Sequence, residues 1–326
     1  MSPRGWCPSV FTPMQADDGL LVRVKPTAAQ LSAAQLSILA EAAAREGNGK
    51  VQLTSRANLQ VRGLTASSAE RFARIAIDLG LACADRAAEP VRNVMCAPLA
   101  DADPKAEDAR PFAIALETLL TTEPELHALP AKFGCAVDGA GLAVLPQGAD
   151  VHVTLQRDRA FVGLAEASLA HRTAATPAAA TGAVRALAVT FLGRGARRMR
   201  HLVAELGAAE IFALAGLDAE PFVPPHPRPL PVGYSAYGKG SGCFAAALPF
   251  GLGETPALLA LAAVAERHAA GRLATTPWRA FALPLVEDPA AVATALAAAG
   301  FIVNSADPRL GTTEAPQLQG VAELLE

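Results

Sequence analysis

Residues 19–64 read GLLVRVKPTAAQLSAAQLSILAEAAAREGNGKVQLTSRANLQVRGL, and residues 242–285 read GCFAAALPFGLGETPALLALAAVAERHAAGRLATTPWRAFALPL. Each stretch is typical of a short apolar strand, a helix, a glycine and a second strand, so the two are copies of one pattern. The spacing agrees, because Thr54 follows Gly19 by 35 residues and Thr276 follows Gly242 by 34. A further helix is expected after each copy. The sequence therefore predicts an α/β or α+β fold with duplicated βαβα half-domains.

Two linkers divide the rest of the chain. The acidic segment DADPKAEDARP (101–111) follows the first copy, and the proline-rich segment PFVPPHPRPLP (221–231) precedes the second. We therefore expect a first half-domain over 1–99, an α/β lobe over 104–220, a second half-domain over 226–305 and a short tail over 306–326.

Composition excludes several classes of protein. Hydrophobic residues make up 52% of the chain and charged residues 18%, which favours packed cores over disorder. The 28 basic and 31 acidic residues give a net charge of −3, which argues against a nucleic-acid partner. The five cysteines lie too far apart in sequence to indicate a disulfide framework or a zinc site. No leader and no membrane-spanning apolar run is recognisable, so we expect a cytoplasmic protein without a membrane partner.

One polar row carries the chemical signal. Residues 51–62, VQLTSRANLQVR, alternate between apolar or small and polar residues and predict one continuous strand. Its polar face consists of Gln52, Thr54, Arg56, Asn58, Gln60 and Arg62. A solvated sheet face is the alternative, but such faces usually mix both signs of charge, and this row has no acid. Arginine binds carboxylates through two parallel hydrogen bonds, so the row favours an anion-binding surface.

Two further basic segments extend this set. Arg92 and Asn93 lie in EPVRNVMCAP, and Lys132 lies in LPAKF. Each cation alone would be an ordinary surface charge. Taken with the polar row, the candidate anion-binding residues are Arg56, Asn58, Gln60, Arg62, Arg92, Asn93 and Lys132; no metal ligands are predicted.

The segments LTSRANLQVRG, VRNVMC and LPAKF, in this order and with the half-domain repeated, resemble the nitrite/sulfite reductase superfamily. Within it they resemble the precorrin-3B synthase family most. The resemblance implies ferredoxin-like half-domains and an α/β lobe around a tetrapyrrole, with a 4Fe-4S cluster and an iron or sirohaem-type site. It also implies that Arg56 and Arg92 contact tetrapyrrole carboxylates or a small anion, and that Lys132 faces the same site.

The activity implied by this resemblance belongs to aerobic cobalamin biosynthesis. It is an oxygen-dependent oxidoreductase reaction that hydroxylates precorrin-3A and closes a lactone. The substrate is an anionic tetrapyrrole, and the need for electrons makes an electron-donor protein a candidate partner.

Three departures from the superfamily pattern keep alternatives open. Gly134 stands where its reductases usually carry a second lysine, which disfavours sulfite or nitrite reduction. Trp278 stands where Arg56 falls in the first copy, and either a core position or a place against a macrocycle is compatible with it. No cysteine follows Cys243, although thiolates are the expected cluster ligands. The alternatives are a non-catalytic tetrapyrrole-binding or shortened relative without the iron–sulfur centre, and a sulfite or nitrite reductase.

Overall fold

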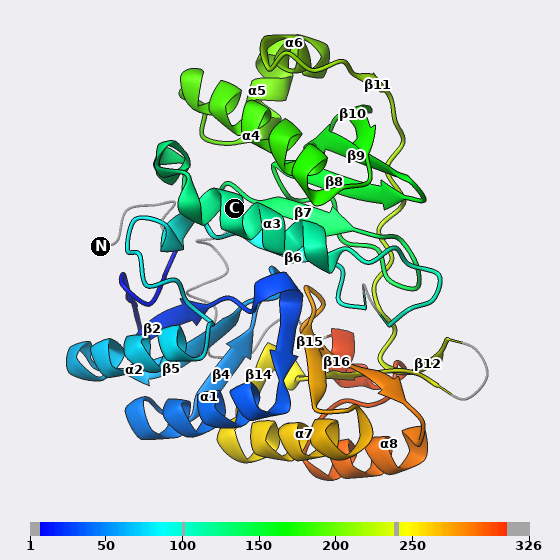
Figure 1. Cartoon of the computed structure of the whole chain (residues 1–326). Coiled ribbons are helices and arrows are strands. Elements are labelled where there is room, and N and C mark those ends of the chain that lie inside the picture. Colours follow the sequence, from blue (N-terminus) through cyan, green and yellow to red (C-terminus); the bar gives the residue numbers. More distant parts are fainter. Residues whose placement is uncertain (1–6, 100–101, 238–240, 312–326) are drawn as a thin grey trace. The chain divides into compact units, whose positions relative to one another are not determined.

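The computed structural model describes residues 7–99, 102–237 and 241–311, which form two compact units (Figure 1). The first unit takes its residues from 1–26, 30–81 and 231–326, and the second from 27–29 and 82–230. The predicted tail over 306–326 lies largely outside the described residues. In the described part of the chain, no helix has the length and apolar character that crossing a bilayer requires.

The first unit contains the duplication that the sequence predicts. The first copy consists of β2 (Gly19–Val24), β3 (Gln30–Ser32), α1 (Ala33–Glu46), β4 (Lys50–Leu53), β5 (Leu59–Leu64) and α2 (Ala66–Asp78). The second copy repeats this order as β13 (Gly242–Ala247), β14 (Leu252–Glu254), α7 (Thr255–His268), β15 (Arg272–Thr275), β16 (Ala280–Val286) and α8 (Pro289–Ala298). The α+β fold with duplicated half-domains is thereby confirmed.

The two half-domains exchange their shortest strands. One sheet has the order β1-β2-β5-β4-β14, with β1 at Met14–Ala16, and the other has the order β12-β13-β16-β15-β3, with β12 at Gly233–Ala236. Strand β14 of the second copy therefore pairs with β4 of the first, and β3 of the first pairs with β15 of the second. Each half-domain covers an open sheet edge of the other, so neither sheet is complete alone.

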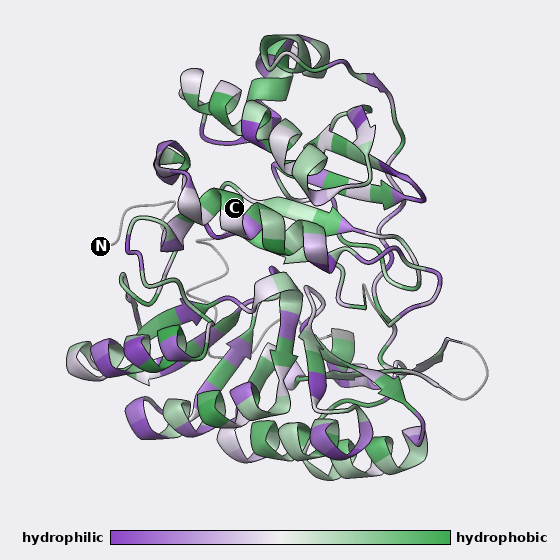
Figure 2. Ribbon diagram, in the orientation of Figure 1, coloured by the Kyte–Doolittle hydropathy of each residue, from purple (hydrophilic) through white to green (hydrophobic). Residues whose placement is uncertain are grey.

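Local sequence explains the helix that follows β3. Ser32 caps α1 by accepting a hydrogen bond from the backbone N–H of Gln35, and the Gln35 side chain accepts one in return from the Ser32 backbone. Leu36 and Leu39 of this helix are fully buried. Figure 2 shows that α2 carries strongly hydrophilic and strongly hydrophobic residues, as expected of a helix with one side in water.

The prediction of one continuous strand over 51–62 is wrong. Strands β4 and β5 form a hairpin in which Leu53 lies opposite Leu59. The Thr54 hydroxyl accepts hydrogen bonds from the backbone N–H groups of Arg56 at 3.3 Å and Asn58 at 3.1 Å, which closes the turn. Ala57 adopts the left-handed conformation, with φ of 57°. The turn has an odd number of residues, five, so each residue of β4 lies opposite a residue of β5 that is an even number of positions away. The polar residues of both strands therefore share one face, and the apolar residues share the other.

The second unit is a six-stranded sheet with helices packed on it. Its strand order is β11 (Glu220–Pro221), β10 (Leu169–Ala174), β9 (Arg159–Leu164), β8 (Val151–Gln156), β7 (Cys135–Asp138) and β6 (Val94–Cys96). Its helices are α3 (Arg110–Thr122), α4 (Pro177–Gly193), α5 (Met199–Leu206) and α6 (Ala208–Leu214). One buried cluster joins Leu116 of α3, Leu187 of α4 and Val153 of β8. The parallel β6–β7 pair sets the two segments VRNVMC and LPAKF side by side at its start.

Candidate functional site

A polar row crosses the first sheet. Arg23 of β2 lies opposite Gln60 of β5, and Gln60 lies opposite Gln52 of β4. Cross-strand partners share a face, so these three side chains lie together, away from the buried side that carries Val51 and Val61. The row contains a cation, two amides and no acid, which is the composition expected of a surface that binds carboxylates.

Arg23 is a site residue that the sequence reasoning missed. Its Nε atom is buried and has no hydrogen-bond partner within the described structure. Burial lowers the pKa of Arg23; Cys7, which also forms a side-chain hydrogen bond with it, raises the pKa, and the charge of Arg56 lowers it. A guanidinium removed from water without a carboxylate carries a desolvation cost that a bound anion would offset. The alternation in GLLVRVKP, which places Arg23 and the buried Lys25 two residues apart, was the available signal.

Arg56 and Asn58 lie on the hairpin turn rather than on a strand, and both are half-buried. No carboxylate of the described residues forms an ion pair with Arg56. Its charge nevertheless acts on Arg23 and lowers the pKa of that guanidinium. Two like charges that act on each other favour an anion that binds both.

Arg62, unlike Arg56, forms an ion pair within the protein. Its Nε and Nη2 atoms donate to the two carboxylate oxygens of Asp18 at 2.9 and 3.0 Å, and its Nη1 atom donates to Gln52 at 3.4 Å. Burial raises the pKa of Asp18, but hydrogen bonds from Arg62 and Asn48 and the Arg62 charge hold it below its usual value. The Arg62 charge is therefore balanced within the protein, and its predicted role in binding stays a prediction.

In the second unit, Asn93 joins the other two predicted segments. Its side-chain amide donates to the carbonyl oxygens of Ala131 at 3.0 Å and Phe133 at 3.1 Å, on either side of Lys132. The amide nitrogen also donates to Pro90 at 2.8 Å. Lys132 is half-buried, and its ammonium group forms no ion pair or hydrogen bond with the residues that the structure describes. Asn93 therefore positions the turn that carries a free cation.

Arg92 lies in an anionic environment. Its side chain is 4% exposed, its Nη1 atom is 2.6 Å from Glu117, and its Nε atom is 3.3 Å from Glu89, which is fully buried. Two carboxylates thus face one guanidinium group. This geometry indicates that Arg92 anchors the segment before β6, while its predicted contact with substrate stays a prediction.

Arg56 belongs to the first unit, and the Asn93–Lys132 pair belongs to the second. The predicted convergence of Arg56, Arg92 and Lys132 on one site therefore stays a prediction. Within the units, the structure groups Arg23 with Arg56, and Arg92–Asn93 with Lys132.

The described residues do not fit an iron–sulfur cluster. No three His, Cys, Asp or Glu side chains among them gather closely enough to hold a metal ion. Cys96, Cys135 and Cys243 are buried, and burial together with the charge of Asp150 raises the pKa of Cys135 to about 12. A thiol held neutral in this way is a poor metal ligand, because clusters bind thiolates.

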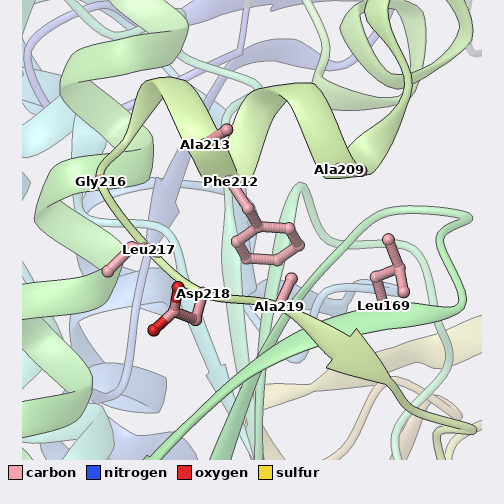
Figure 3. Close-up of a pocket in the computed structure, with 8 residues that line it drawn as sticks. All are labelled: Leu169, Ala209, Phe212, Ala213, Gly216, Leu217, Asp218 and Ala219. Atoms are coloured by element: carbon pink, nitrogen blue, oxygen red, sulfur yellow. The ribbon is translucent and has the colours of Figure 1, made fainter.

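A surface pocket of about 380 Å³ lies elsewhere in the second unit, between α6, the loop that follows α6 and the strand β10 (Figure 3). Leu169, Phe212 and Asp218 are among its lining residues. None of the predicted site residues lines it, so it does not contribute to the cationic row.

Comparison with known proteins agrees with this architecture. A family model described as the nitrite/sulfite reductase ferredoxin-like half domain matches residues 13–77. A precorrin-3B synthase of Sinorhizobium sp. is 35% identical over 319 residues, which cover 94% of this chain and 67% of the relative. The structure of the Mycobacterium tuberculosis NirA protein matches with a TM-score of 0.71 at 20% identity, over 88% of this chain and 57% of that one. The chain thus spans little more than half the length of NirA and about two thirds of its curated relative. It belongs to the precorrin-3B synthase family, as its motifs indicated.

Proposed function

We propose that this chain is a precorrin-3B synthase-like oxidoreductase of aerobic cobalamin biosynthesis. It takes precorrin-3A, oxygen and electrons, hydroxylates the macrocycle and closes a lactone from an acetate arm. The observation that carries the proposal is the cationic, acid-free row of Arg23, Gln60 and Gln52 in a chain 35% identical to a precorrin-3B synthase. A tetrapyrrole that bears many carboxylates suits such a surface.

The protein contributes binding and orientation. Arg23 and Arg56 bind carboxylates of the macrocycle, while Gln52 and Gln60 accept or donate hydrogen bonds without adding charge. Burial of Arg23 strengthens its attraction for an anion, because a guanidinium shielded from water is less screened. Lys132, whose turn is held by the Asn93 amide, stays a predicted anion-binding residue of the second unit.

Electrons reach the substrate from outside the described residues. Those residues offer no cluster site, so a cytoplasmic electron-donor protein supplies the reducing equivalents. The same observation favours a second candidate function, a non-catalytic protein that binds the tetrapyrrole. No observation favours a sulfite or nitrite reductase, since Gly134 leaves Lys132 without a neighbouring lysine.

Binding of uroporphyrin, a stable tetrapyrrole with eight carboxylates, tests the proposed site. Arg56→Ala should weaken binding by roughly 1.5–3 kcal/mol, the range for hydrogen bonds to charged groups, and leave the melting temperature unchanged. Arg74→Ala, at an exposed arginine on α2, is the matched control and should bind like the unmodified protein. A protein that does not bind the probe, or equal affinities of the two variants, contradicts the proposal.

Turnover separates the two candidate functions. Anaerobically purified protein is analysed for iron and acid-labile sulfide and is then given precorrin-3A, oxygen and a reductant. Formation of the hydroxylated lactone supports the enzyme. Tight tetrapyrrole binding without iron and without product supports the binding protein.

A further inference from the structure

We infer that Arg279, on a turn of the second half-domain, binds a carboxylate of the same tetrapyrrole as Arg56. The inference rests on the proposed function and adds a residue to it. None of the predicted site residues comes from the second half-domain, so Arg279 would make the site a product of both copies.

The turn that carries Arg279 repeats the Arg56 turn. The Thr276 N–H donates to the carbonyl oxygen of Ala280 at 3.1 Å, as that of Thr54 does to Asn58 at 2.9 Å. The Thr276 hydroxyl accepts from the N–H of Trp278 at 3.3 Å, as that of Thr54 accepts from Arg56. Trp278 therefore occupies the place of Arg56. It is half-buried on a turn, and its place in the core or against a macrocycle stays a prediction.

Arg279 occupies the place of Ala57 in a backbone conformation that does not suit it. Its φ is 58°, almost equal to the 57° of Ala57. Long side chains adopt this left-handed region rarely and at a cost, and such strain is found most often at functional sites. The Arg279 side chain is half-buried, and among the described residues it forms no ion pair or hydrogen bond that would offset the cost.

The two turns lie close together because the half-domains exchange strands. A methyl group added to Gly251, just before β14, would be 2.8 Å from the carbonyl oxygen of Leu53 and 3.0 Å from Cδ of Arg279. Leu53 is the last residue before the Arg56 turn. The aliphatic part of Arg279 and the strand end that leads into the Arg56 turn therefore lie against the same glycine.

The charges on this part of the molecule suit a ligand with several anionic groups. Arg23 and Arg56 act on each other electrostatically, and Arg279 adds a third guanidinium without a carboxylate partner in the described structure. A single carboxylate cannot pair with three guanidinium groups in the bidentate geometry that arginine favours. A macrocycle with carboxylates around its rim can offer one group to each of the three.

Substitution of Arg279 by glycine separates binding from folding. Glycine adopts a φ of 58° freely, so Arg279→Gly should raise the melting temperature or leave it unchanged. The same variant should bind uroporphyrin roughly 10- to 100-fold more weakly, the factor that corresponds to a lost charged hydrogen bond. Arg279→Gln, which keeps a long side chain without charge, should lose affinity similarly. Arg267→Ala, at an exposed arginine on α7, is the control and should keep full affinity.

The number of carboxylates provides a second readout. Coproporphyrin has four carboxylates, so the loss of Arg279 should cost less affinity for it than for uroporphyrin. Full affinity of Arg279→Gly or Arg279→Gln, in a protein whose Arg56→Ala variant binds poorly, overturns this inference and leaves the proposed function standing. If the unmodified protein binds neither probe, both fail together.

Discussion

Replacement of Arg92 by alanine tests whether this residue stabilises the fold or binds the substrate. The resemblance to the reductase superfamily implies the second role. The structure places the guanidinium between the carboxylates of Glu89 and Glu117, with 4% of its side chain exposed. The Glu89 carboxylate also accepts a hydrogen bond from the backbone N–H of Cys83 at 2.7 Å, so it cannot turn away to reach water.

The expected cost follows from the burial of Glu89. The Glu89 side chain is 0% exposed, and removal of Arg92 takes away the guanidinium that lies 3.3 Å from its carboxylate in the interior. Breaking a buried ion pair in this way destabilises proteins by about 3–5 kcal/mol. With a urea dependence of about 2 kcal/mol per molar, the unfolding midpoint should fall by roughly 1.5–2.5 M.

Urea unfolding followed by circular dichroism measures this shift, and uroporphyrin titration under native conditions measures binding in parallel. The double variant Arg92→Met/Glu89→Gln removes the Arg92–Glu89 pair while roughly keeping its volume, so it should be more stable than Arg92→Ala. An Arg92→Ala variant with an unchanged midpoint and a large loss of tetrapyrrole affinity would refute the assignment of Arg92 to the anchor.

Three further outcomes are expected. Arg62→Ala should lower the free energy of unfolding by roughly 0.2–1 kcal/mol, measured in urea, because its pair with Asp18 is partly exposed, and it should weaken uroporphyrin binding less than Arg56→Ala does. Cys135, whose pKa burial raises to about 12, should resist iodoacetamide at pH 8 in the folded protein, while the half-buried Cys7 reacts; mass spectrometry of the alkylated chain shows which thiols were modified. Burial lowers the pKa of His152 below 6.5, so the unfolded chain binds the proton more readily, and stability should fall as pH drops below 6.5, by at most about 1.4 kcal/mol per pH unit. His152→Gln should flatten that pH dependence in urea titrations.

The duplication could be predicted because short-range sequence patterns indicate it. The separations of Gly19 from Thr54 and of Gly242 from Thr276 fix the positions of the strands and helices in each copy. The capping box of Ser32 and Gln35 at the start of α1 is a signal of the same local kind. These features depend on residues a few positions apart, which is the range over which sequence patterns are informative.

The hairpin at the Arg56 turn was missed for a physical reason. The segment SRAN contains no glycine or proline, the residues that usually mark a turn. Ala57 takes the left-handed conformation instead, and the Thr54 side chain provides hydrogen bonds that a turn needs. Because the turn preserves the alternation of the two strands, periodicity alone could not distinguish one strand from two.

The ion pairs of Arg62 and Arg92 could not be predicted from the sequence. Arg62 pairs with Asp18, which lies 44 residues earlier, and Arg92 pairs with Glu117, 25 residues later. Such partners are brought together only by the fold. The exchange of β3 and β14 could not be predicted from the sequence either. Each strand has only three residues, and each pairs with a strand of the other half-domain, which is far away in the sequence.

The two half-domains differ most where the proposed site lies. In the second sheet, the row that corresponds to Arg23, Gln60 and Gln52 consists of Ala245, Ala282 and Ala274, in which each residue lies opposite the next. All three alanines are at most 1% exposed, so this face is dry and has no room or hydrogen-bond partners for a charged ligand. Among the described residues of the second copy, a turn at the end of its strands can still reach an anion on the first. Its Arg279 turn is such a position, because the strand exchange sets it against the end of β4. The proposed site is therefore asymmetric, although the two half-domains share one fold. Its cations lie on the first sheet, and the second half-domain contributes Arg279 from a turn.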